Sequence, residues 1–384
     1  MTQALSIEGP VERAHRDIPL PRERTAQVRG SAALPAGLTV VSADNHWTVT
    51  GDIFYERFPA HLRERAPRLR TDEQGNHLWE LNGESMLPPA IMTNLASFET
   101  VPGATAIEPR LRDLDAEGVV KELNFGNAIN LAHSLPDLEV RDWVYRIYNQ
   151  HLAELAAQAP GRFYGVGMLN HWDMAKVKDS LAELIDLGLK TFMLPQMPKG
   201  ADNSSLNYCL PEMDPLWAAI EESGLPVCFH VGEFFQDGPG GLGTTAMVTF
   251  GPFRKNLGEL IFGGIFDRHP GLQVVFAEGD LNWVPGALQT AEMVYDCFAV
   301  DPVPARRPTE YWHDHCYATF QSDPIGLSML DVIGADRVMW ASDYPHAEST
   351  FGLGWTAMEA VVDAVTEEQA RMILGDTATR LFKL

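Results

Sequence analysis

Ionisable side chains follow several short apolar runs of this 384-residue chain, at points where strands are expected to end. In "VVSADNH", Asp44 and His46 are two positions apart and therefore point to the same face of a strand. The run "LPVCFHVG" contains His230, "LQVVFAEG" contains Glu278, and "DRVMWASD" ends at Asp343. Imidazole and carboxylate groups are ligands that suit zinc, manganese and iron. These residues therefore indicate a divalent metal site, provided that the fold brings the four strand ends together.

The segment after the last apolar run, "SDYPHAE", adds two more groups to this set. His346 lies three positions after Asp343, and Glu348 follows two positions later. We expect His346 to support a ligand, to carry protons or to be an additional ligand, with Glu348 as its orienting partner. The alternative is a turn that the histidine caps and a solvated glutamate. We favour the alternative for Glu348 but not for His346.

Eight apolar runs alternate with amphipathic stretches, and this alternation predicts the fold. The expected strands are "GLTVVSADNH", "VVKELNFGNA", "GRFYGVGMLN", "LKTFMLPQ", "LPVCFHVG", "LQVVFAEG", "CYATFQSD" and "DRVMWASD". Apolar residues at helical spacing predict helices near 139–158, 173–188, 213–224 and 282–298. Eight such units predict a (β/α)8 TIM barrel, in which the C-terminal ends of the strands form one rim. A doubly wound sheet is the alternative, but no GxGxxG motif follows the first strand.

Two segments lie outside this rhythm. Residues 1–36 are polar and rich in Arg and Pro, and we expect an N-terminal arm that is flexible or wraps a partner. Residues 37–384 would then form the barrel. Within it, residues 47–107 carry many Pro, Asn and Glu residues and predict an insertion after strand 1, as a lid or a dimerisation element.

Composition narrows the classes of partner. The formal net charge is -23 and the pI is near 4.8, which argues against nucleic acids and anionic membranes as partners. A small anionic molecule stays compatible, because one local arginine or metal ion can outweigh the overall field. The cysteines at positions 209, 228, 297 and 316 form no CxxC pair, which suits a reducing cytosol. No apolar run is long enough to span a bilayer, and we expect a cytoplasmic protein.

Longer motifs accompany the ionisable residues. They are "SADNH", "RLRDLDAEGV", "APGRFYGVGML", "PLWAAIEESGLPVCFHVG", "RHPGLQVVFAEGDLNWVP" and "IGADRVMWASDYPH". Through them the sequence from about Leu38 onward resembles the amidohydrolase superfamily, in the branch of aminocarboxymuconate semialdehyde decarboxylase and the γ-resorcylate decarboxylases. The resemblance implies a distorted TIM barrel with a divalent metal at the C-terminal rim. By position, it implies Asp44, His46, His230 and Asp343 as ligands.

Two positions depart from that family's pattern. The first-strand motif is Asp-x-His, where many members have His-x-His or Glu-x-His. Glu278 stands where the decarboxylases have a histidine that activates the metal-bound water. Another residue must then move the proton, and Asp343, His346 and Glu278 are the catalytic candidates. Alternatively, Glu278 is a further metal ligand, in a set that is large for one ion and sufficient for two.

Three functions fit these residues. The first is an enzyme with one Zn, Mn or Fe ion that hydrolyses or decarboxylates a small carboxylated substrate, through a metal-activated water or a metal-polarised substrate. The second is a dinuclear Fe or Mn/Fe oxygenase that uses Glu278 as a ligand. The third is a non-catalytic subunit that assembles with a paralogue. We favour the first, in a homodimer or a hetero-oligomer with a paralogous subunit.

Five further residues are candidates for substrate contact. His133 and His171 follow the second and third expected strands and so belong to the same rim. Arg254 could pair with a substrate carboxylate. Trp47 and Trp283 complete the set, although a tryptophan at either position fits equally well in the core.

Overall fold

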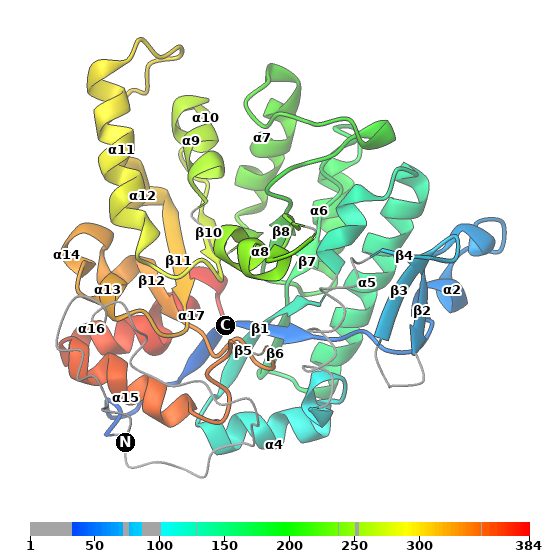
Figure 1. Cartoon of the computed structure of the whole chain (residues 1–384), viewed down its shortest axis with the longest axis horizontal. Helices are drawn as coiled ribbons and strands as arrows, with labels where there is room; N and C mark the ends of the chain where they lie inside the picture. The colour runs from blue at the N-terminus through cyan, green and yellow to red at the C-terminus, as the bar shows by residue number, and fades with distance from the viewer. Residues whose placement is uncertain are drawn as a thin grey trace.

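The structure is a computed structural model that describes residues 33–71, 77–86, 101–127, 129–236, 238–249, 253–346 and 348–384. Of the expected arm, only residues 33–36 belong to the described residues, so its role stays a prediction. The rest of the described chain forms an α/β structure with parallel strands at its centre (Figure 1).

All eight expected strands are present. They are β1 (Val41–Trp47), β5 (Lys121–Gly126), β6 (Phe163–Gly165) with β7 (Gly167–Met168), β8 (Phe192–Leu194), β9 (Val227–His230), β10 (Val274–Ala277), β11 (Cys316–Phe320) and β12 (Val338–Trp340). The expected third strand is interrupted at Val166 and gives both β6 and β7. A single irregular residue therefore divides one expected strand between two sheets.

The parallel strands form two sheets, in the orders β1-β5-β6 and β12-β11-β10-β9-β8-β7. Backbone hydrogen bonds connect these sheets on both sides. On one side, Val166 N donates to Asn124 O at 2.8 Å. On the other, Asp343 N donates to Asp44 O at 2.9 Å and His46 N donates to Tyr344 O at 2.6 Å. The segment after β12 thus pairs with β1, and the strands surround one axis as the TIM barrel requires.

Helices alternate with the strands and cover the outside of the ring (Figure 1). They are α4 (Ile107–Glu117), α5 (Leu138–Gln158), α6 (Val177–Asp186), α7 (Asp214–Ser223), α8 (Gly241–Thr249), α9 (Arg254–Phe262), α10 (Ile265–Arg268), α11 (Trp283–Cys297), α12 (Pro308–His315), α13 (Pro324–Leu327), α14 (Leu330–Ile333), α15 (Gly354–Ala364), α16 (Glu367–Arg371) and α17 (Thr377–Phe382). The four helices expected from periodicity correspond to α5, α6, α7 and α11. Within the described ranges, none of the helices has the length and apolar character needed to cross a membrane.

Local chemistry explains where several helices begin and end. The Asp137 side chain accepts hydrogen bonds from two backbone N–H groups at the start of α5, as an N-cap does. Helix α4 ends at Glu117 and is followed by Gly118, which has a φ of 78° that favours glycine.

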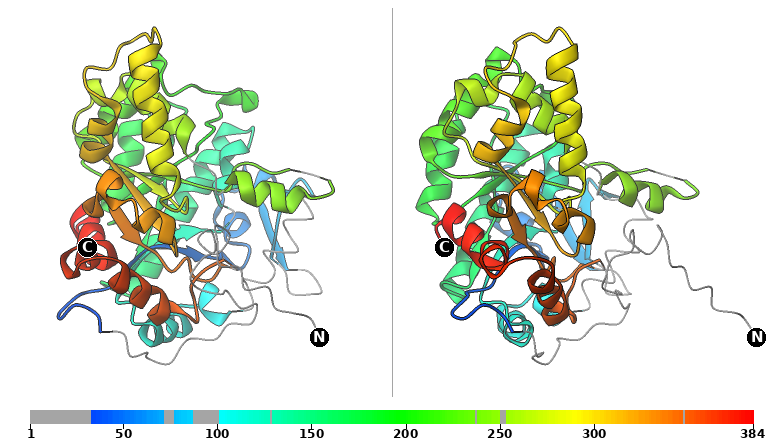
Figure 2. Two further views of the ribbon diagram at one scale, coloured as in Figure 1. Left: turned by 60° about the vertical axis from the view of Figure 1, so that its left-hand side comes forward. Right: turned by 90° about the vertical axis from the view of Figure 1, so that its left-hand side faces the viewer.

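Helix α8 differs from the others because it extends outward from the body, as both views in Figure 2 show.

The expected insertion begins after β1 and has no strand–helix alternation. Its described part contains α2 (Ile53–Arg57) and a small antiparallel sheet of β2 (Arg68–Thr71), β3 (His77–Leu81) and β4 (Glu84–Ser85). Phe54 packs on Trp79 with ring centroids 5.0 Å apart, and Arg57 pairs with Glu154 of α5 at 2.9 Å. The sheet is thus attached beside the barrel. Its function as a lid or a dimerisation element stays a prediction.

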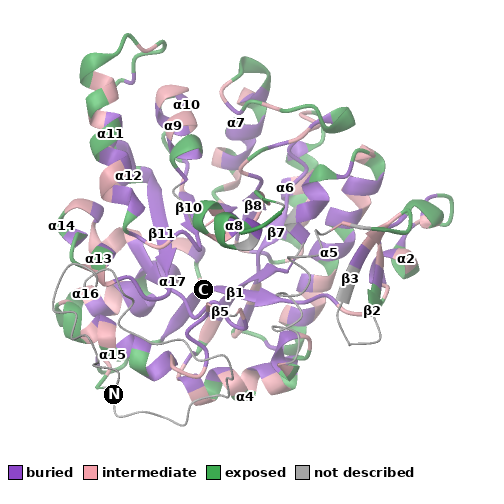
Figure 3. Cartoon of the chain, viewed as in Figure 1, coloured by how far each residue is buried: buried purple, intermediate pink, exposed green. Residues whose placement is uncertain are grey.

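Burial follows the layers of the fold. The central strands are buried except for the partly exposed Lys121 and Tyr164, whereas the helices alternate between buried and exposed faces (Figure 3). Large apolar side chains such as Trp217, Trp312 and Trp340 fill the interior. The C-terminal ends of the strands are also buried, but they carry polar side chains. These polar ends are where the candidate site lies.

Candidate metal centre

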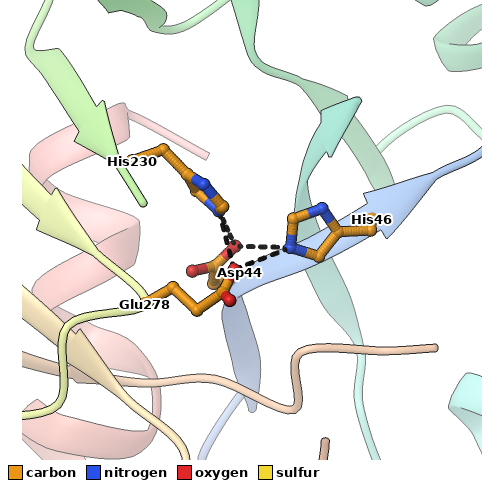
Figure 4. Close-up of side chains that lie close together, drawn as sticks. All are labelled: Asp44, His46, His230 and Glu278. Carbon is orange, nitrogen blue, oxygen red and sulfur yellow. Dashed lines mark hydrogen bonds and ion pairs between the residues drawn. The ribbon is translucent and has the colours of Figure 1, made fainter. Parts of the chain in front are cut away.

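Four strand ends bring their ionisable side chains to one point. Asp44 and His46 come from β1, His230 ends β9, Glu278 follows β10, and Asp343 follows β12. Two overlapping groups have ligand atoms within 4.8 Å of one another: Asp44, His46, His230 and Glu278, and His46, Glu278, Asp343 and His346. Figure 4 shows the first group, with two imidazole rings and two carboxylates directed at a common centre.

The distances within this cluster are short. His46 Nε2 lies 3.2 Å from Glu278 Oε2, 3.1 Å from Asp343 Oδ1 and 3.7 Å from Asp44 Oδ1. His230 Nε2 lies 3.0 Å from Glu278 Oε2 and 3.5 Å from Asp44 Oδ1. Three carboxylates and two imidazole nitrogens therefore share one buried volume.

His346 approaches the same cluster from the segment after β12. Its Nδ1 atom lies 3.3 Å from Asp343 Oδ1 and 3.9 Å from Glu278 Oε2. Its ring stacks on that of His46, with centroids 3.7 Å apart. Glu348 is more distant, with Oε1 4.0 Å from His346 Nδ1. The structure thus places His346 against the cluster, with Glu348 near the same Nδ1 atom.

An unusual backbone conformation directs Glu278 into the cluster. Ala277 is paired with His230, so these two residues point to the same face of the sheet. Regular alternation would turn the next residue, Glu278, to the opposite face. Its φ of 64° breaks the alternation, in a region that a non-glycine residue rarely adopts. Asp343 has a φ of 59°, so two residues of the cluster have strained backbones.

Neighbouring side chains hold the strained segment in place. Glu278 N donates to Thr319 Oγ1 of β11 at 2.8 Å, and the same hydroxyl is 3.4 Å from Asp44 Oδ2. Asp323 accepts hydrogen bonds from the N–H groups of Leu281 and Asn282, each at 2.8 Å. The turn after β10 is therefore fixed by residues that follow β11 and by β11 itself.

A buried ion pair supports the β1 side of the cluster. The Arg110 guanidinium donates to Glu122 at 2.6 Å and 2.8 Å, and also donates to the backbone oxygen of His46 at 2.9 Å. Asn45 donates to Glu122 at 2.6 Å and accepts from Tyr344 N at 3.0 Å. This network connects α4, β1, β5 and the segment after β12. It fixes the backbone on which His46 lies.

The pKa values of the three carboxyl groups shift in different directions. Burial raises the pKa of Asp44, and it raises the pKa of Asp343 to about 6. For Glu278, burial alone would raise the pKa, but the charge and hydrogen bond of His230 hold it well below its usual range. Glu278 is therefore the carboxylate of this cluster that most firmly stays ionised.

The pKa values of the three imidazole groups are also shifted. Burial lowers the pKa of His46 to about 4. Burial also acts to lower the pKa of His230 and His346, but nearby carboxylates outweigh it. As a result, Asp44 and Glu278 raise the pKa of His230 well above its usual range, and Asp343 is the main cause that raises that of His346 to about 10. The protons on His230 and His346 compensate part of the negative charge of the carboxylates. A metal cation bound at the cluster could replace these protons.

The arrangement of polar atoms fits a divalent cation. Asp44 Oδ1 and both carboxylate oxygens of Asp343 are buried and accept no hydrogen bond from the described residues. His230 Nδ1 donates to Val231 O at 2.9 Å, so Nε2 is the atom that faces the cluster, where loss of its proton would give a cation a lone pair. Buried carboxylate oxygens are normally satisfied, and a metal ion is a common reason for an exception. The donor set of carboxylate oxygens and imidazole nitrogens suits zinc, manganese or iron.

Three of the residues suggested for substrate contact lie elsewhere. Trp47 lies on the outward face of β1. Its ring packs against Phe163, with centroids 5.8 Å apart. Trp283 packs in the core against Trp312 and donates to the Asp280 backbone oxygen. Arg254 is exposed on α9. These contacts are those of core and surface residues, and a contact of these three residues with a substrate stays a prediction.

The two histidines of that set are buried at the rim. His133 Nε2 lies 3.7 Å from Glu233 Oε2, and His171 Nδ1 is 3.3 Å from Leu169 O. Glu233 follows β9, three positions after His230, and accepts hydrogen bonds from Gln196 N and Met197 N. Both histidines thus lie on the side of the barrel expected from the sequence. Their contact with a substrate stays a prediction.

Sequence reasoning did not identify the supporting residues Thr319, Asp323 and Arg110. The position of Thr319 within "CYATFQSD" gave one usable signal, because alternation along that strand directs its hydroxyl to the barrel interior. Arg110 was visible only as part of "RLRDLDAEGV". Thr319 and Asp323 bond to backbone groups 41 and 42 positions away, and Arg110 bonds to His46 O 64 positions away, so spacing alone could not reveal these contacts.

Comparison with known proteins identifies the family. The family model described as Amidohydrolase matches residues 71–384. The chain belongs to the amidohydrolase family. Among curated amidohydrolase relatives, γ-resorcylate decarboxylase of Rhodococcus jostii is 27% identical over 324 residues, which cover 77% of this chain and 95% of the relative.

Solved structures of amidohydrolases share the fold. An amidohydrolase from Mycobacterium avium subsp. paratuberculosis has a TM-score of 0.71 at 17% identity, over 90% of this chain and 99% of that chain. A dihydroxybenzoic acid decarboxylase from a Polaromonas species, solved with manganese and 2-nitroresorcinol, has a TM-score of 0.63 at 17% identity, over 90% and 97% of the two chains. These likenesses confirm the barrel predicted from the sequence.

Proposed function

We propose that this amidohydrolase is a metal-dependent decarboxylase of an aromatic carboxylate that carries a hydroxyl group. The observation that carries the proposal is the buried group of carboxylate oxygens without hydrogen-bond donors, beside the imidazole nitrogens of His46 and His230. The names of the relatives support the reaction class, because they include γ-resorcylate, 2,6-dihydroxybenzoate and 5-carboxyvanillate decarboxylases. Hydrolysis of a carboxylated substrate has less support, because these relatives are named as decarboxylases.

The proposed ligands are Asp44, His46, His230 and Asp343, with Glu278 as a further ligand or as a base. Manganese is the first candidate ion, because two solved decarboxylases contain it, and zinc and iron also suit these donors. One ion suffices for the proposed reaction. The two overlapping ligand groups would also permit a second ion, which measured metal content decides.

The chemistry divides between the ion and the chain. A bound divalent ion supplies positive charge that holds and polarises the oxygens of the substrate. Decarboxylation breaks the bond between the ring carbon and the carboxylate carbon, releases CO2 and leaves an electron pair that must take a proton. We assign delivery of that proton to Asp343 and His346, whose facing atoms are 3.3 Å apart. Burial of the cluster keeps bulk water from the reacting atoms.

The comparisons lend no support to the oxygenase or to the non-catalytic subunit. A direct test distinguishes them. Manganese-loaded protein is incubated without oxygen with 2,6-dihydroxybenzoate or 5-carboxyvanillate, and CO2 release is measured. Release that is lost in His46→Ala and Asp343→Asn supports the proposal. In a parallel incubation with oxygen, oxygen uptake without CO2 release would favour the oxygenase. A metal-replete protein inert toward both acids would contradict the substrate class proposed here.

A further inference from the structure

Asn127 contacts the metal centre indirectly, from the end of β5. Its side chain is buried, and its Oδ1 atom lies 2.8 Å from Nε2 of His346. We propose that Asn127 is a positioning residue, which holds His346 so that Nδ1 faces the carboxylates of Asp343 and Glu278. The inference rests on the proposed metal centre and adds to it a residue that sets how the His346 imidazole meets Asp343, a proposed ligand.

In the structure, the amide of Asn127 directs Nδ2 at Thr48 and Oδ1 at His346. Its backbone N–H donates to Trp47 O at 2.9 Å, and its Nδ2 donates to Thr48 Oγ1 at 2.8 Å. With Nδ2 engaged in this way, Oδ1 is the atom left for His346, and it can only accept. The Nε2 atom of His346 must then carry the proton. A neutral imidazole protonated at Nε2 keeps its lone pair on Nδ1, the atom that faces the cluster.

Two contacts together determine the position of the His346 ring. Stacking on His46, at 3.7 Å between centroids and 18° between planes, fixes the plane of the ring but allows a half-turn about the Cβ–Cγ bond, which would exchange Nδ1 with a carbon. The hydrogen bond to Asn127 removes that rotation. Nδ1 is then held 3.3 Å from Asp343 Oδ1 and 3.9 Å from Glu278 Oε2. Partners of this kind commonly change metal affinity by about 10–100-fold when they are removed.

The experiment measures Mn²⁺ affinity of the full chain by competition with a chelator. Asn127→Leu removes the acceptor at similar size and is expected to weaken Mn²⁺ binding about 10–100-fold. Asn127→Asp keeps an acceptor and is expected to retain most of the affinity. Asn170→Leu is the matched control, because Asn170 is another buried rim asparagine whose amide donates to Asp142. Its Mn²⁺ affinity is expected to equal that of the wild type.

A double variant separates positioning from general loss of structure. If Asn127 acts through His346, Asn127→Leu with His346→Ala binds Mn²⁺ no more weakly than His346→Ala alone. Additive losses would overturn the inference. Thr48→Val is a second variant in case Asn127→Leu does not fold, since it removes the partner of the amide Nδ2. It is expected to weaken binding as well.

The outcomes distinguish the inference from the proposal beneath it. Wild-type affinity in Asn127→Leu, or in Thr48→Val where that variant replaces it, would overturn the inference alone. A wild-type chain that binds none of Mn²⁺, Zn²⁺ and Fe²⁺ would overturn the metal centre and the inference together.

Discussion

Glu278 is the residue that most distinguishes this cluster. It replaces the histidine expected from the family pattern, and it places a third carboxylate beside Asp44 and Asp343. Its Oε2 atom is within 3.2 Å of both His46 Nε2 and His230 Nε2. Three buried carboxylates in contact repel one another, and a cation compensates that repulsion more completely than shared protons do. The chemistry of the site therefore depends on this one side chain.

Replacement of Glu278 by Gln tests that dependence. The substitution keeps the shape and removes the charge, so we expect Mn²⁺ affinity to fall at least about 10-fold, as loss of a ligand or of its close support does. Glu348→Gln is the matched control, because its carboxylate is 4.0 Å from His346 at the edge of the cluster. The readout is Mn²⁺ bound per chain at fixed chelator concentration. Equal retention of metal by both variants would exclude Glu278 as a ligand.

The pKa of His346 predicts how the metal-free protein responds to pH. Asp343 is the main cause that raises this pKa from 6.5 to about 10, so the folded state binds a proton more tightly than the unfolded state. This contribution to stability is complete below about pH 6.5 and is lost as the pH rises toward about 10. We expect the melting temperature to fall over that range in metal-free wild type and to fall less in His346→Gln.

Saturating Mn²⁺ serves as the control for the pH experiment. The cation takes the place of the proton, so the slope of melting temperature against pH should decrease in its presence. Identical slopes in wild type and His346→Gln without metal would show that other groups govern the response.

At the scale of elements, β11 holds the turn that follows β10. Thr319 of β11 accepts the backbone N–H of Glu278, and Asp323 holds the turn that follows. A residue with a φ of 64° persists only where its surroundings over-determine it. The strain at Glu278 is therefore maintained by the next strand and not by its own sequence.

Thr319→Val tests that support. It leaves the Glu278 N–H without an acceptor, which should cost about 1–3 kcal/mol of unfolding free energy and also weaken Mn²⁺ binding. Thr191→Val is a matched change just before β8, because Thr191 is equally buried and its hydroxyl donates to Pro226 O. That control should lose stability but keep its Mn²⁺ affinity. Loss of affinity in both variants would indicate a general effect of weakened packing.

The elements were predictable from the sequence, but several side-chain directions were not. Apolar runs located all eight strands, because each run is short, buried and bounded by turn residues. The same alternation that correctly paired Asp44 with His46 would have turned Glu278 away from the barrel axis. Only the backbone of the turn, held by contacts with β11, decides its direction. Asn127 was overlooked for a related reason, because its partner His346 is 219 positions away.

At the scale of the whole molecule, the Arg110 network connects the beginning and the end of the barrel. Arg110 and Glu122 are fully buried, and their partners belong to α4, β1, β5 and the segment that contains Tyr344. A buried charge that loses its partner is costly, because neither water nor another charge solvates it. The network is therefore a sensitive point of the global fold.

Arg110→Met is expected to lower the free energy of unfolding by about 3–5 kcal/mol, because Glu122 would stay buried without its partner. Arg112→Met on the same helix removes an exposed pair with Glu108 and should cost no more than about 1 kcal/mol. Urea unfolding of each variant measures both changes in the free energy of unfolding. Adding Glu122→Leu to Arg110→Met should recover much of the loss. A double variant as unstable as the single one would show that shape, and not charge, dominates at this position.

The bonds between β1 and the segment after β12 also bear on how the protein is made. Ser342 N donates to Ser42 Oγ at 2.8 Å, across 300 positions of the chain. A ribosome must therefore release almost all of the intervening polypeptide before the first and last ligands can meet. An incomplete chain contains Asp44 and His46 but not Asp343. Tight binding of the metal ion therefore requires that synthesis has reached the last strand. In a cell, a loaded metal would mark those copies that have been translated through the last strand and have closed their ring.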